Sequence, residues 1–299
     1  MNILVTGAKG QVGRELVKNG HLKGFSMVGT THHELDITDR HAIENTLFKN
    51  NIRLAINAAA YTAVDKAETE PYSAFDVNSK GASCIASACS KANIPLIHIS
   101  TDYVFNGEKK EPYVETDPVS PVGVYGKSKA QGEVEVKNNL KQHIILRTSW
   151  VYGADGHNFV KTMIRLAKTT DTIRVVDDQS GCPTSAREIA KAILSIADHI
   201  QRLKDPKWGT YHYCGMGTTS WFGFAKKIFE IANEFEPLAV KQVVPIRTDE
   251  YPTAAKRPAN SALNCDLIRQ HFGIIQTPWE QSLEEMITDL YSLPKEKNT

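Results

Sequence analysis

The 299-residue sequence lacks several features that mark specialised classes of protein. Its five cysteines are odd in number and form no C-x-x-C pair, which argues against a disulfide framework or a zinc site. No apolar run reaches the roughly 18 residues needed to span a bilayer, and no secretory signal pattern is visible. We therefore expect a reduced, soluble, cytoplasmic protein without a membrane partner.

The sequence also has no excess of positive or of negative charge. Lys plus Arg number 35 and Asp plus Glu number 34, so nothing in the composition supports a nucleic-acid partner. The hydrophobic content of 41% suits one large domain or two smaller ones with a sizeable core. These properties are typical of an ordinary globular protein.

The first residues show the pattern of a strand, a glycine turn and a helix. An apolar run over 2–5 precedes Gly7, Gly10 and Gly13, and helical periodicity begins at residue 11. Gly7 would allow the tight turn, Gly10 would let a pyrophosphate approach the backbone, and Gly13 would let the helix pack against the strand. The free N–H groups of the helix start would attract phosphate. The spacing differs from G-x-G-x-x-G, so an ordinary strand–helix turn is the alternative.

Strands alternate with helices over 1–150, which predicts an α/β, Rossmann-type, doubly wound parallel sheet. The expected strands are 2–5, 25–30, 53–57, 94–100 and 143–150. The expected helices between them are 11–17, 40–50, 71–93 and 128–138. We assign 1–150 to a dinucleotide-binding domain and 151–299 to a smaller substrate-binding domain, with 172–202 returning to the sheet. The tail 294–299 is expected to be frayed.

Tyr125 and Lys129 give the sharpest chemical signal. They are four residues apart, so they share one face of a helix. We expect a nearby ammonium to lower the phenol pKa from about 10, which would make the pair a proton donor and acceptor near neutral pH. A surface Tyr and Lys is the alternative, but the glycine turn upstream favours the catalytic interpretation.

Polar residues follow the fourth predicted strand, in the segment IHISTDYVF over 97–105. A hydroxyl at this strand end can hydrogen-bond a substrate carbonyl, and both Ser100 and Thr101 are candidates. The alternative is a turn that Ser, Thr and Asp side chains stabilise.

These features resemble the extended type of the short-chain dehydrogenase/reductase superfamily. Five segments sharpen the resemblance: NAAAYTAVDKAE at 57–68, STDYVF at 100–105, VYGKSK at 124–129, RTSWVY at 147–152 and RPANSAL at 257–263. In order and spacing they are similar to the dTDP-4-dehydrorhamnose reductase family, from residue 1 to about 279. The resemblance implies an NAD(P)H-dependent oxidoreductase that reduces the C4 keto group of dTDP-4-dehydro-L-rhamnose to give dTDP-L-rhamnose.

The resemblance also implies roles for single residues. Tyr125 would donate the proton, Lys129 would bind the nicotinamide ribose and tune Tyr125, and Thr101 would complete the catalytic triad. The remaining cofactor-binding residues would be Gly7, Gly10, Gln11, Val12, Gly13, Asp36, Ile37, Ala60, Tyr61 and Thr62.

A dTDP-sugar substrate would meet a second group of residues. Asp102 and Trp150 would contact the nucleotide-sugar. Arg257 is the candidate for its pyrophosphate, because a guanidinium matches phosphate oxygens with two parallel hydrogen bonds. The alternative for Arg257 is a surface position in a polar loop.

The choice of nicotinamide cofactor depends on the end of the second predicted strand. The sequence GTTHH at 29–33 offers no acidic residue to bind the ribose of NADH. Arg14 and Lys9 could accept a 2′-phosphate, so we expect NADPH, with NADH as a second candidate. His32 and His33 are interpreted as exposed loop residues rather than a metal pair.

The reductase family is also associated with Mg²⁺, held by glutamates where two subunits of a homodimer meet. Glu15 and Glu188 stand at matching positions, but this chain offers Asp289 where a glutamate is expected. We therefore assign no metal ligand from the sequence.

Two other functions remain open at this point. One is a nucleotide-sugar epimerase or dehydratase of the same superfamily, which the acidic Asp102 beside Thr101 would suit. The other is a non-catalytic regulatory subunit on the same fold, against which the intact Thr101, Tyr125 and Lys129 argue.

Overall fold

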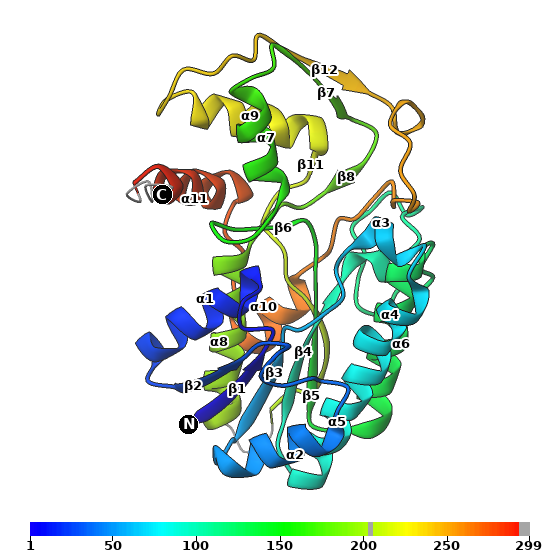
Figure 1. Cartoon of the computed structure of the whole chain (residues 1–299), viewed down its shortest axis with the longest axis vertical. Coiled ribbons are helices and arrows are strands. Elements are labelled where there is room, and N and C mark those ends of the chain that lie inside the picture. Colours follow the sequence, from blue (N-terminus) through cyan, green and yellow to red (C-terminus); the bar gives the residue numbers. More distant parts are fainter. Residues whose placement is uncertain (203–205, 293–299) are drawn as a thin grey trace.

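A six-stranded parallel sheet forms the centre of the protein (Figure 1). The computed structural model describes residues 1–202 and 206–292, so the expected frayed tail lies outside the described residues. The strand order is β10-β5-β4-β3-β1-β2. These strands are β1 (Asn2–Thr6), β2 (Ser26–Thr30), β3 (Leu54–Asn57), β4 (Leu96–Thr101), β5 (His143–Thr148) and β10 (Gly209–His212). The predicted Rossmann-type fold is confirmed.

Helices cover both faces of this sheet (Figure 1). On one face lie α1 (Gln11–Gly20) and α8 (Ala186–Arg202). On the other lie α2 (Arg40–Lys49), α5 (Gly81–Ala92) and α6 (Val124–Asn139). Strand β3 is buried along its whole length, as expected where both faces of a parallel sheet are covered. The strand order reverses between β1 and β3, which is where such sheets bind ligands.

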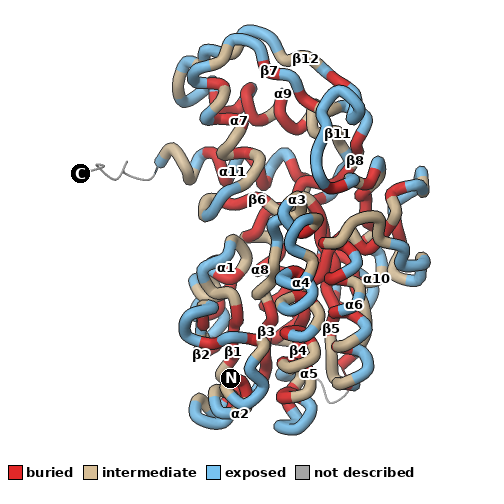
Figure 2. The backbone as a smooth tube through the Cα atoms, turned by 45° about the vertical axis from the view of Figure 1, so that its right-hand side comes forward, coloured by how far each residue is buried: buried red, intermediate tan, exposed pale blue. Residues whose placement is uncertain are grey.

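The second half of the chain builds a separate packed layer above the sheet (Figures 1 and 2). Its helices are α7 (Phe159–Ala167), α9 (Trp221–Ala232) and α11 (Trp279–Ser292). Its strand pairs are β7 (Thr172–Val176) with β12 (Gln242–Ile246), β6 (Val151–Tyr152) with β9 (Thr184–Ser185), and β8 (Ser180–Gly181) with β11 (Thr219–Ser220). Buried Phe224, Ile228 and Leu283 belong to its own apolar core.

The expectation that 172–202 returns to the sheet is wrong for its strand. Strand β7 pairs with β12, and the sixth strand of the central sheet is β10, which we did not predict. In β7 buried and exposed residues alternate, so this strand suits a sheet with one covered face. Helix α8 does pack beside α1 on the central sheet (Figure 1).

Short helices complete the layer that contains α6. They are α3 (Val64–Ala67), α4 (Pro71–Phe75) and a π-helical turn (Asp76–Lys80), whereas α10 (Asp266–Phe272) packs against β10 and α8. The predicted helix over 71–93 is therefore interrupted by the π turn. Helix α6 begins at Val124 rather than at residue 128, which places Tyr125 in its first turn. Within the described ranges we find no helix that is both long and apolar enough to cross a bilayer.

Candidate active site

The glycine turn after β1 has the close approaches that the sequence predicts. Gly7 has φ +69°, and a Cβ atom there would lie 2.7 Å from the backbone oxygen of Ala58 at the end of β3. A Cβ at Gly13 would lie 2.1 Å from the Gly7 carbonyl oxygen, so Gly13 packs against the turn rather than against the strand. Gly10 starts α1, and no side chain caps this helix. The uncapped helix start can therefore offer its N–H groups to phosphate oxygens.

The loop after β3 is tied to α6 by a buried asparagine that the sequence analysis missed. The Asn78 side chain accepts a hydrogen bond from the Tyr61 N–H (2.9 Å) and donates to the Tyr61 carbonyl (3.0 Å). It also donates to Ser128 Oγ at 3.0 Å, and Ser128 Oγ donates to the Tyr125 carbonyl at 2.8 Å. Asn78 belongs to the π turn, a feature that the periodicity of 71–93 does not reveal.

Thr101 and Tyr125 meet at the carboxyl end of β4. Thr101 is buried, and its Oγ1 donates to Asp102 Oδ1 at 3.0 Å. The nearby Thr101 hydroxyl opposes the rise that burial causes in the pKa of Tyr125. The Tyr125 ring packs edge-on against Tyr103, with centroids 5.5 Å apart. The predicted hydroxyl and phenol therefore lie together.

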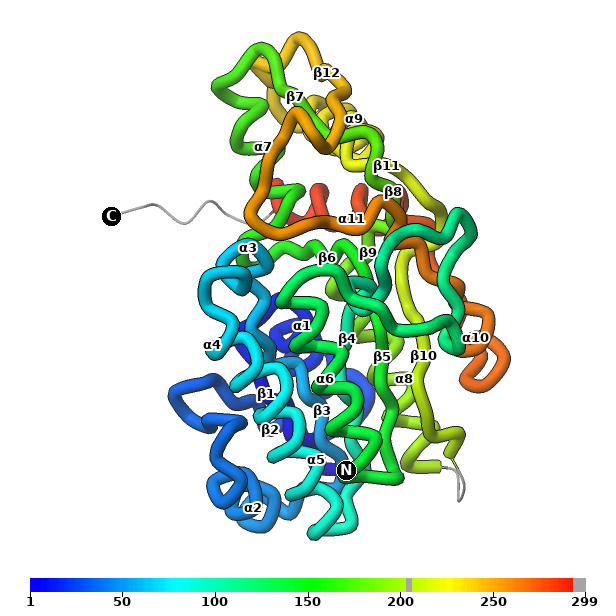
Figure 3. Tube along the Cα trace, turned by 90° about the vertical axis from the view of Figure 1, so that its right-hand side faces the viewer, coloured from blue at the N-terminus to red at the C-terminus, as the bar shows by residue number. Residues whose placement is uncertain are grey.

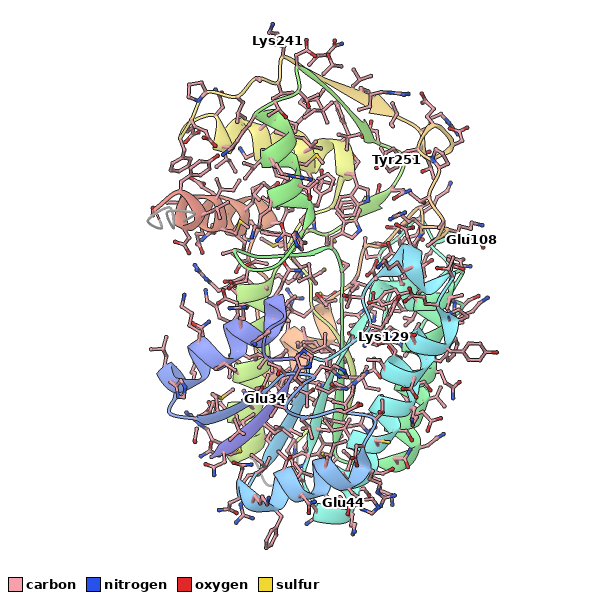
Figure 4. The ribbon with its side chains drawn as sticks, in the orientation of Figure 1. Glu34, Glu44, Glu108, Lys129, Lys241 and Tyr251 are labelled. Carbon is pink, nitrogen blue, oxygen red and sulfur yellow. The ribbon has the colours of Figure 1, made fainter. Side chains whose placement is uncertain are left out.

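The structure contradicts the expectation that Lys129 lowers the pKa of the Tyr125 phenol. Burial raises the pKa of Tyr125 well above its usual value, so the phenol keeps its proton at neutral pH. Lys129 Nζ donates to the Ile99 carbonyl of β4 at 2.7 Å instead of acting on the phenol. Figure 4 shows Lys129 between α6 and the strands. Burial lowers the pKa of Lys129 to about 8, and the nearby Glu133 carboxylate opposes this shift.

Ser100 and Thr101 point in different directions, which separates the two candidate hydroxyls. Ser100 Oγ donates to Glu133 Oε1 at 2.6 Å, in the interior between β4 and α6. Glu133 also forms a buried two-point ion pair with Arg147, at 2.8 and 2.6 Å. Glu133 therefore occupies the Ser100 hydroxyl, and Thr101 is the hydroxyl that interacts with the Tyr125 phenol.

Asp102 is buried beside Thr101. Burial raises the pKa of its carboxyl to about 6. Its Oδ2 atom has no hydrogen-bond partner among the described residues. A buried carboxylate oxygen without a partner costs free energy, so a polar ligand group at this position would be favoured.

Trp150 lies at the junction between the sheet and the upper layer. Its φ is +47°, and its ring stacks on Trp221 with centroids 3.5 Å apart and planes 7° apart. A Cβ at Gly181 would lie 2.4 Å from the Trp150 ring, so glycine makes room for the indole. Trp221 and Gly181 therefore hold the ring of Trp150, the predicted sugar contact, in place.

Arg257 comes from the segment that follows β12 and reaches back to the first half of the chain. Its Nη2 donates to Asp65 Oδ2 at 3.0 Å. Its Nη1 is buried and has no hydrogen-bond partner among the described residues. Arg257 is therefore a partly exposed loop residue whose guanidinium is held by an ion pair.

The end of β2 carries a carboxylate that the sequence analysis did not consider. Glu34 turns back, and its Oε2 accepts hydrogen bonds from the Thr31 N–H (2.8 Å) and hydroxyl (2.7 Å) (Figure 4). His32 and His33 are exposed, as expected. An acidic side chain therefore does lie near this strand end, one residue beyond the segment 29–33, and Thr31 holds its carboxylate.

The other expected cofactor residues near this end have defined partners. Arg14 donates to the Lys9 carbonyl at 3.1 Å and lies 3.8 Å from Asp155. Asp36 Oδ1 accepts from the N–H and hydroxyl of Thr38, both at 2.9 Å, which lowers the pKa of its carboxyl. Ile37 buries its side chain against Gly81, so only its backbone is free to face a cofactor.

The residues considered for Mg²⁺ do not fit a metal site. Glu15 accepts a hydrogen bond from Asn19, and Glu188 accepts from Lys191 and Thr277. Asp289 pairs with the cationic Arg187. No group of three or more potential ligands is found over 1–202 and 206–292. Arg187 thus supplies a positive charge beside Asp289 within the chain.

The parallel sheet, the glycine turn at its switch point and the Thr101–Tyr125–Lys129 cluster define a Rossmann-type protein of the short-chain dehydrogenase/reductase class. The family model described as "RmlD substrate binding domain" matches residues 1–292. The dTDP-4-dehydrorhamnose reductase of Aggregatibacter actinomycetemcomitans is 45% identical, over 95% of this chain and 97% of its own length. The chain belongs to the dTDP-4-dehydrorhamnose reductase family.

Solved structures agree with this assignment. A dTDP-4-dehydrorhamnose reductase from Clostridium acetobutylicum has a TM-score of 0.90 and 41% identity, covering 97% of this chain and 99% of its own. The Bacillus anthracis reductase in complex with NADP has a TM-score of 0.89 and 38% identity, covering 96% and 99%.

Proposed function

We propose that this protein reduces the C4 keto group of dTDP-4-dehydro-L-rhamnose with NADPH to give dTDP-L-rhamnose. The observation that carries the proposal is the Thr101–Tyr125–Lys129 cluster, at the carboxyl end of β4 in a chain of this family. Curated relatives named for this activity support the substrate, and the NADP complex of the Bacillus anthracis relative supports the cofactor.

The residues for the cofactor lie at the switch point between β1 and β3. The uncapped start of α1, with Gly7, Gly10 and Gly13, would hold the pyrophosphate through backbone N–H groups of Gln11 and Val12. Asp36, Ile37, Ala60, Tyr61 and Thr62 would line the rest of the cofactor, and Arg14 would face a 2′-phosphate. When bound, NADPH supplies the hydride that reduces C4.

The chain's own residues manage the proton and the charge. As C4 is reduced, negative charge develops on its oxygen, and the protonated phenol of Tyr125 donates a proton to it. Thr101 hydrogen-bonds the same oxygen and stabilises the developing charge, as an oxyanion donor does. Lys129 keeps its ammonium below about pH 8 and would hold the nicotinamide ribose, which fixes the cofactor relative to Tyr125.

The substrate would lie between the sheet and the upper layer. We assign 1–150, together with α8 and β10, to cofactor binding and the rest of 151–299 to substrate binding, with Asp102, Trp150 and Arg257 at the sugar nucleotide. The Arg257 Nη1 atom, which is buried without a partner, is a suitable donor to a phosphate oxygen.

The test is the loss of NADPH absorbance with dTDP-4-dehydro-L-rhamnose, with UDP-linked keto-sugars as controls. C4-deuterated NADPH should place deuterium at C4 of the product. An epimerase would return the hydride and show no net loss of absorbance, and a regulatory subunit would show no turnover. Either result would overturn the proposal.

A further inference from the structure

The short helix α3 lies where the two layers of the protein meet. Figures 1 and 3 show it at the upper end of the layer formed by α4, α5 and α6, beside the orange segment that follows β12. Asp65 lies in this helix and Glu68 directly follows its last residue, and neither acidic residue has a part in the chemistry described above. Both make long-range contacts to the machinery of the site.

Glu68 binds the start of the catalytic helix. Its Oε1 accepts a hydrogen bond from the Val124 N–H at 2.8 Å, directly before Tyr125. Gly123, the residue before α6, offers no side-chain cap. Glu68 therefore supplies from another element the cap that the local sequence lacks, and a carboxylate also suits the positive end of a helix.

The backbone at Gly123 leaves room for this contact. A Cβ atom at Gly123 would lie 2.8 Å from Glu68 Oε1. Any side chain at this position would push the carboxylate away from the Val124 N–H. The contact of Glu68 with the Val124 N–H thus depends on a glycine at position 123.

Asp65 holds Arg257. Its Oδ2 accepts from Arg257 Nη2 at 3.0 Å, and its Oδ1 accepts from the Ala255 N–H at 3.1 Å. These contacts fix both the guanidinium and the backbone just before it. Arg257 Nη1 is left buried without a partner in the described chain, so it is free for a ligand.

The two contacts converge on the same centre. Arg257 lies close enough to Tyr103 to oppose the rise that burial causes in the pKa of that phenol, to about 12. The Tyr103 ring in turn packs edge-on against Tyr125. One four-residue helix and the residue after it therefore contact the helix start that carries the proton donor and the arginine beside it.

We infer that Asp65 and Glu68 are positioning residues for the reductase reaction. Glu68 sets the placement of Tyr125 by capping α6, and Asp65 orients Arg257 so that its free nitrogen faces the substrate diphosphate. The inference rests on the proposed function and explains why these acidic residues accompany the cofactor loop in the segment 57–68.

Two variants of Glu68 and one variant of Gly123 test the role of Glu68. Glu68→Ala removes the acceptor and should lower kcat by about 10- to 100-fold with the KM and the NADPH affinity nearly unchanged, because Tyr125 is misplaced. Glu68→Gln keeps an acceptor oxygen and should restore most of the kcat. Gly123→Ala leaves Glu68 intact but displaces it, and should resemble Glu68→Ala. Equal kcat values in the wild type and Glu68→Ala, or equal losses in Ala and Gln, would overturn this role.

Asp65 should show the opposite kinetic pattern. Asp65→Ala should raise the KM by about 10-fold with little change in kcat, since a contact to a charged group far from C4 is lost. Asp65→Ala/Arg257→Ala should be little worse than Arg257→Ala alone, because the contacts of Asp65 with Ala255 and Arg257 both serve to place the Arg257 guanidinium. A loss in kcat alone, or additive effects in the double variant, would refute the assignment.

The control is Asp198→Asn, which removes an aspartate from an Asp–Arg pair with Arg202 at the far end of α8. Its kcat and KM should stay within about twofold of the wild type, as for most exposed ion pairs. If the wild type reduces the substrate and the α3 variants match it, the positioning inference fails alone. If the wild type itself shows no turnover, the proposed function fails.

Discussion

Replacing Tyr125 by Phe removes one oxygen atom from the proposed centre and little else. The side chain is 9% exposed, and its ring packs against Tyr103 with an angle of 74° between the planes. A phenylalanine fills the same space, so the fold should stay intact. The polar interaction between the phenol and the Thr101 hydroxyl is lost.

The expected loss can be set from the role of the phenol. A general acid contributes about 10²–10⁴-fold, so kcat should fall by that factor, which equals roughly 2.7 to 5.5 kcal/mol. The lost polar interaction should cost at most about 0.5 to 1.5 kcal/mol of stability, the range of one hydrogen bond. Because burial raises the phenol pKa, wild-type Tyr125 is protonated throughout the neutral range, and the ratio of wild-type to variant kcat should change little there.

The assay is single-turnover oxidation of NADPH, with C4-deuterated NADPH to show that hydride transfer limits the rate. NADPH affinity, measured by calorimetry, should be nearly kept. Tyr211→Phe is the matched control, because it removes a buried phenol from β10 that donates to the Lys207 carbonyl at 2.8 Å. If Tyr125→Phe keeps a near-full rate while the isotope effect is large, Tyr125 is not the acid and the mechanism is refuted.

Four further changes test other parts of the site. Gly10→Val should abolish NADPH binding in a folded protein, because its side chain would occupy the space for the pyrophosphate; calorimetric titration with unchanged affinity would contradict this. Arg14→Ala should weaken NADPH more than NADH, and equal losses in a fluorescence titration would show that Arg14 does not bind the 2′-phosphate. The kcat should fall as the pH rises through about 8, where Lys129 loses its proton, and Lys129→Met should lack this decline; a wild-type profile that is flat to pH 10 would refute it. Asp102→Asn should raise the Tm at pH 8. The folded-state pKa of Asp102, about 6, lies above the unfolded value of about 3.9, so the wild-type protein loses stability as the pH rises from about 4 through 6. A gain in Tm that does not shrink toward pH 4 would speak against this cause.

The sequence predicts the parts of the fold that local pattern determines. Strands β1, β3, β4 and β5 are apolar and almost fully buried, and helices alternate with the strands of the first half, so the Rossmann-type order follows from periodicity. The strand β10 was missed because Gly209–His212 is short and its pairing with β5 joins residues far apart in the chain. Nothing in its four residues indicates that partner.

In the candidate site, too, the sequence predicts what local spacing determines and misses what depends on distant contacts. Gly7, Gly10 and Gly13 could be assigned roles from their spacing, and Tyr125 with Lys129 from a helical turn. The pKa of Tyr125 was predicted in the wrong direction, because sequence spacing gives the neighbour but not the depth of burial. Asn78 and Glu68 were missed for a related reason: their partners Ser128 and Val124 are 50 and 56 residues away.

The path of the chain between the layers has a consequence for any attempt to divide the molecule. After β5 it enters the upper layer, returns through α8 and β10 to the central sheet, and leaves again before α9 (Figure 1). A chain cut at residue 150 would therefore lose both the edge strand β10 and the helix that covers α1. The cofactor half would expose the apolar face of Leu16 and Ile3, which belong to the same core as Ile189 and Ile193 of α8. Limited proteolysis between the layers should thus release no independently folded cofactor-binding fragment, and the two halves should unfold together.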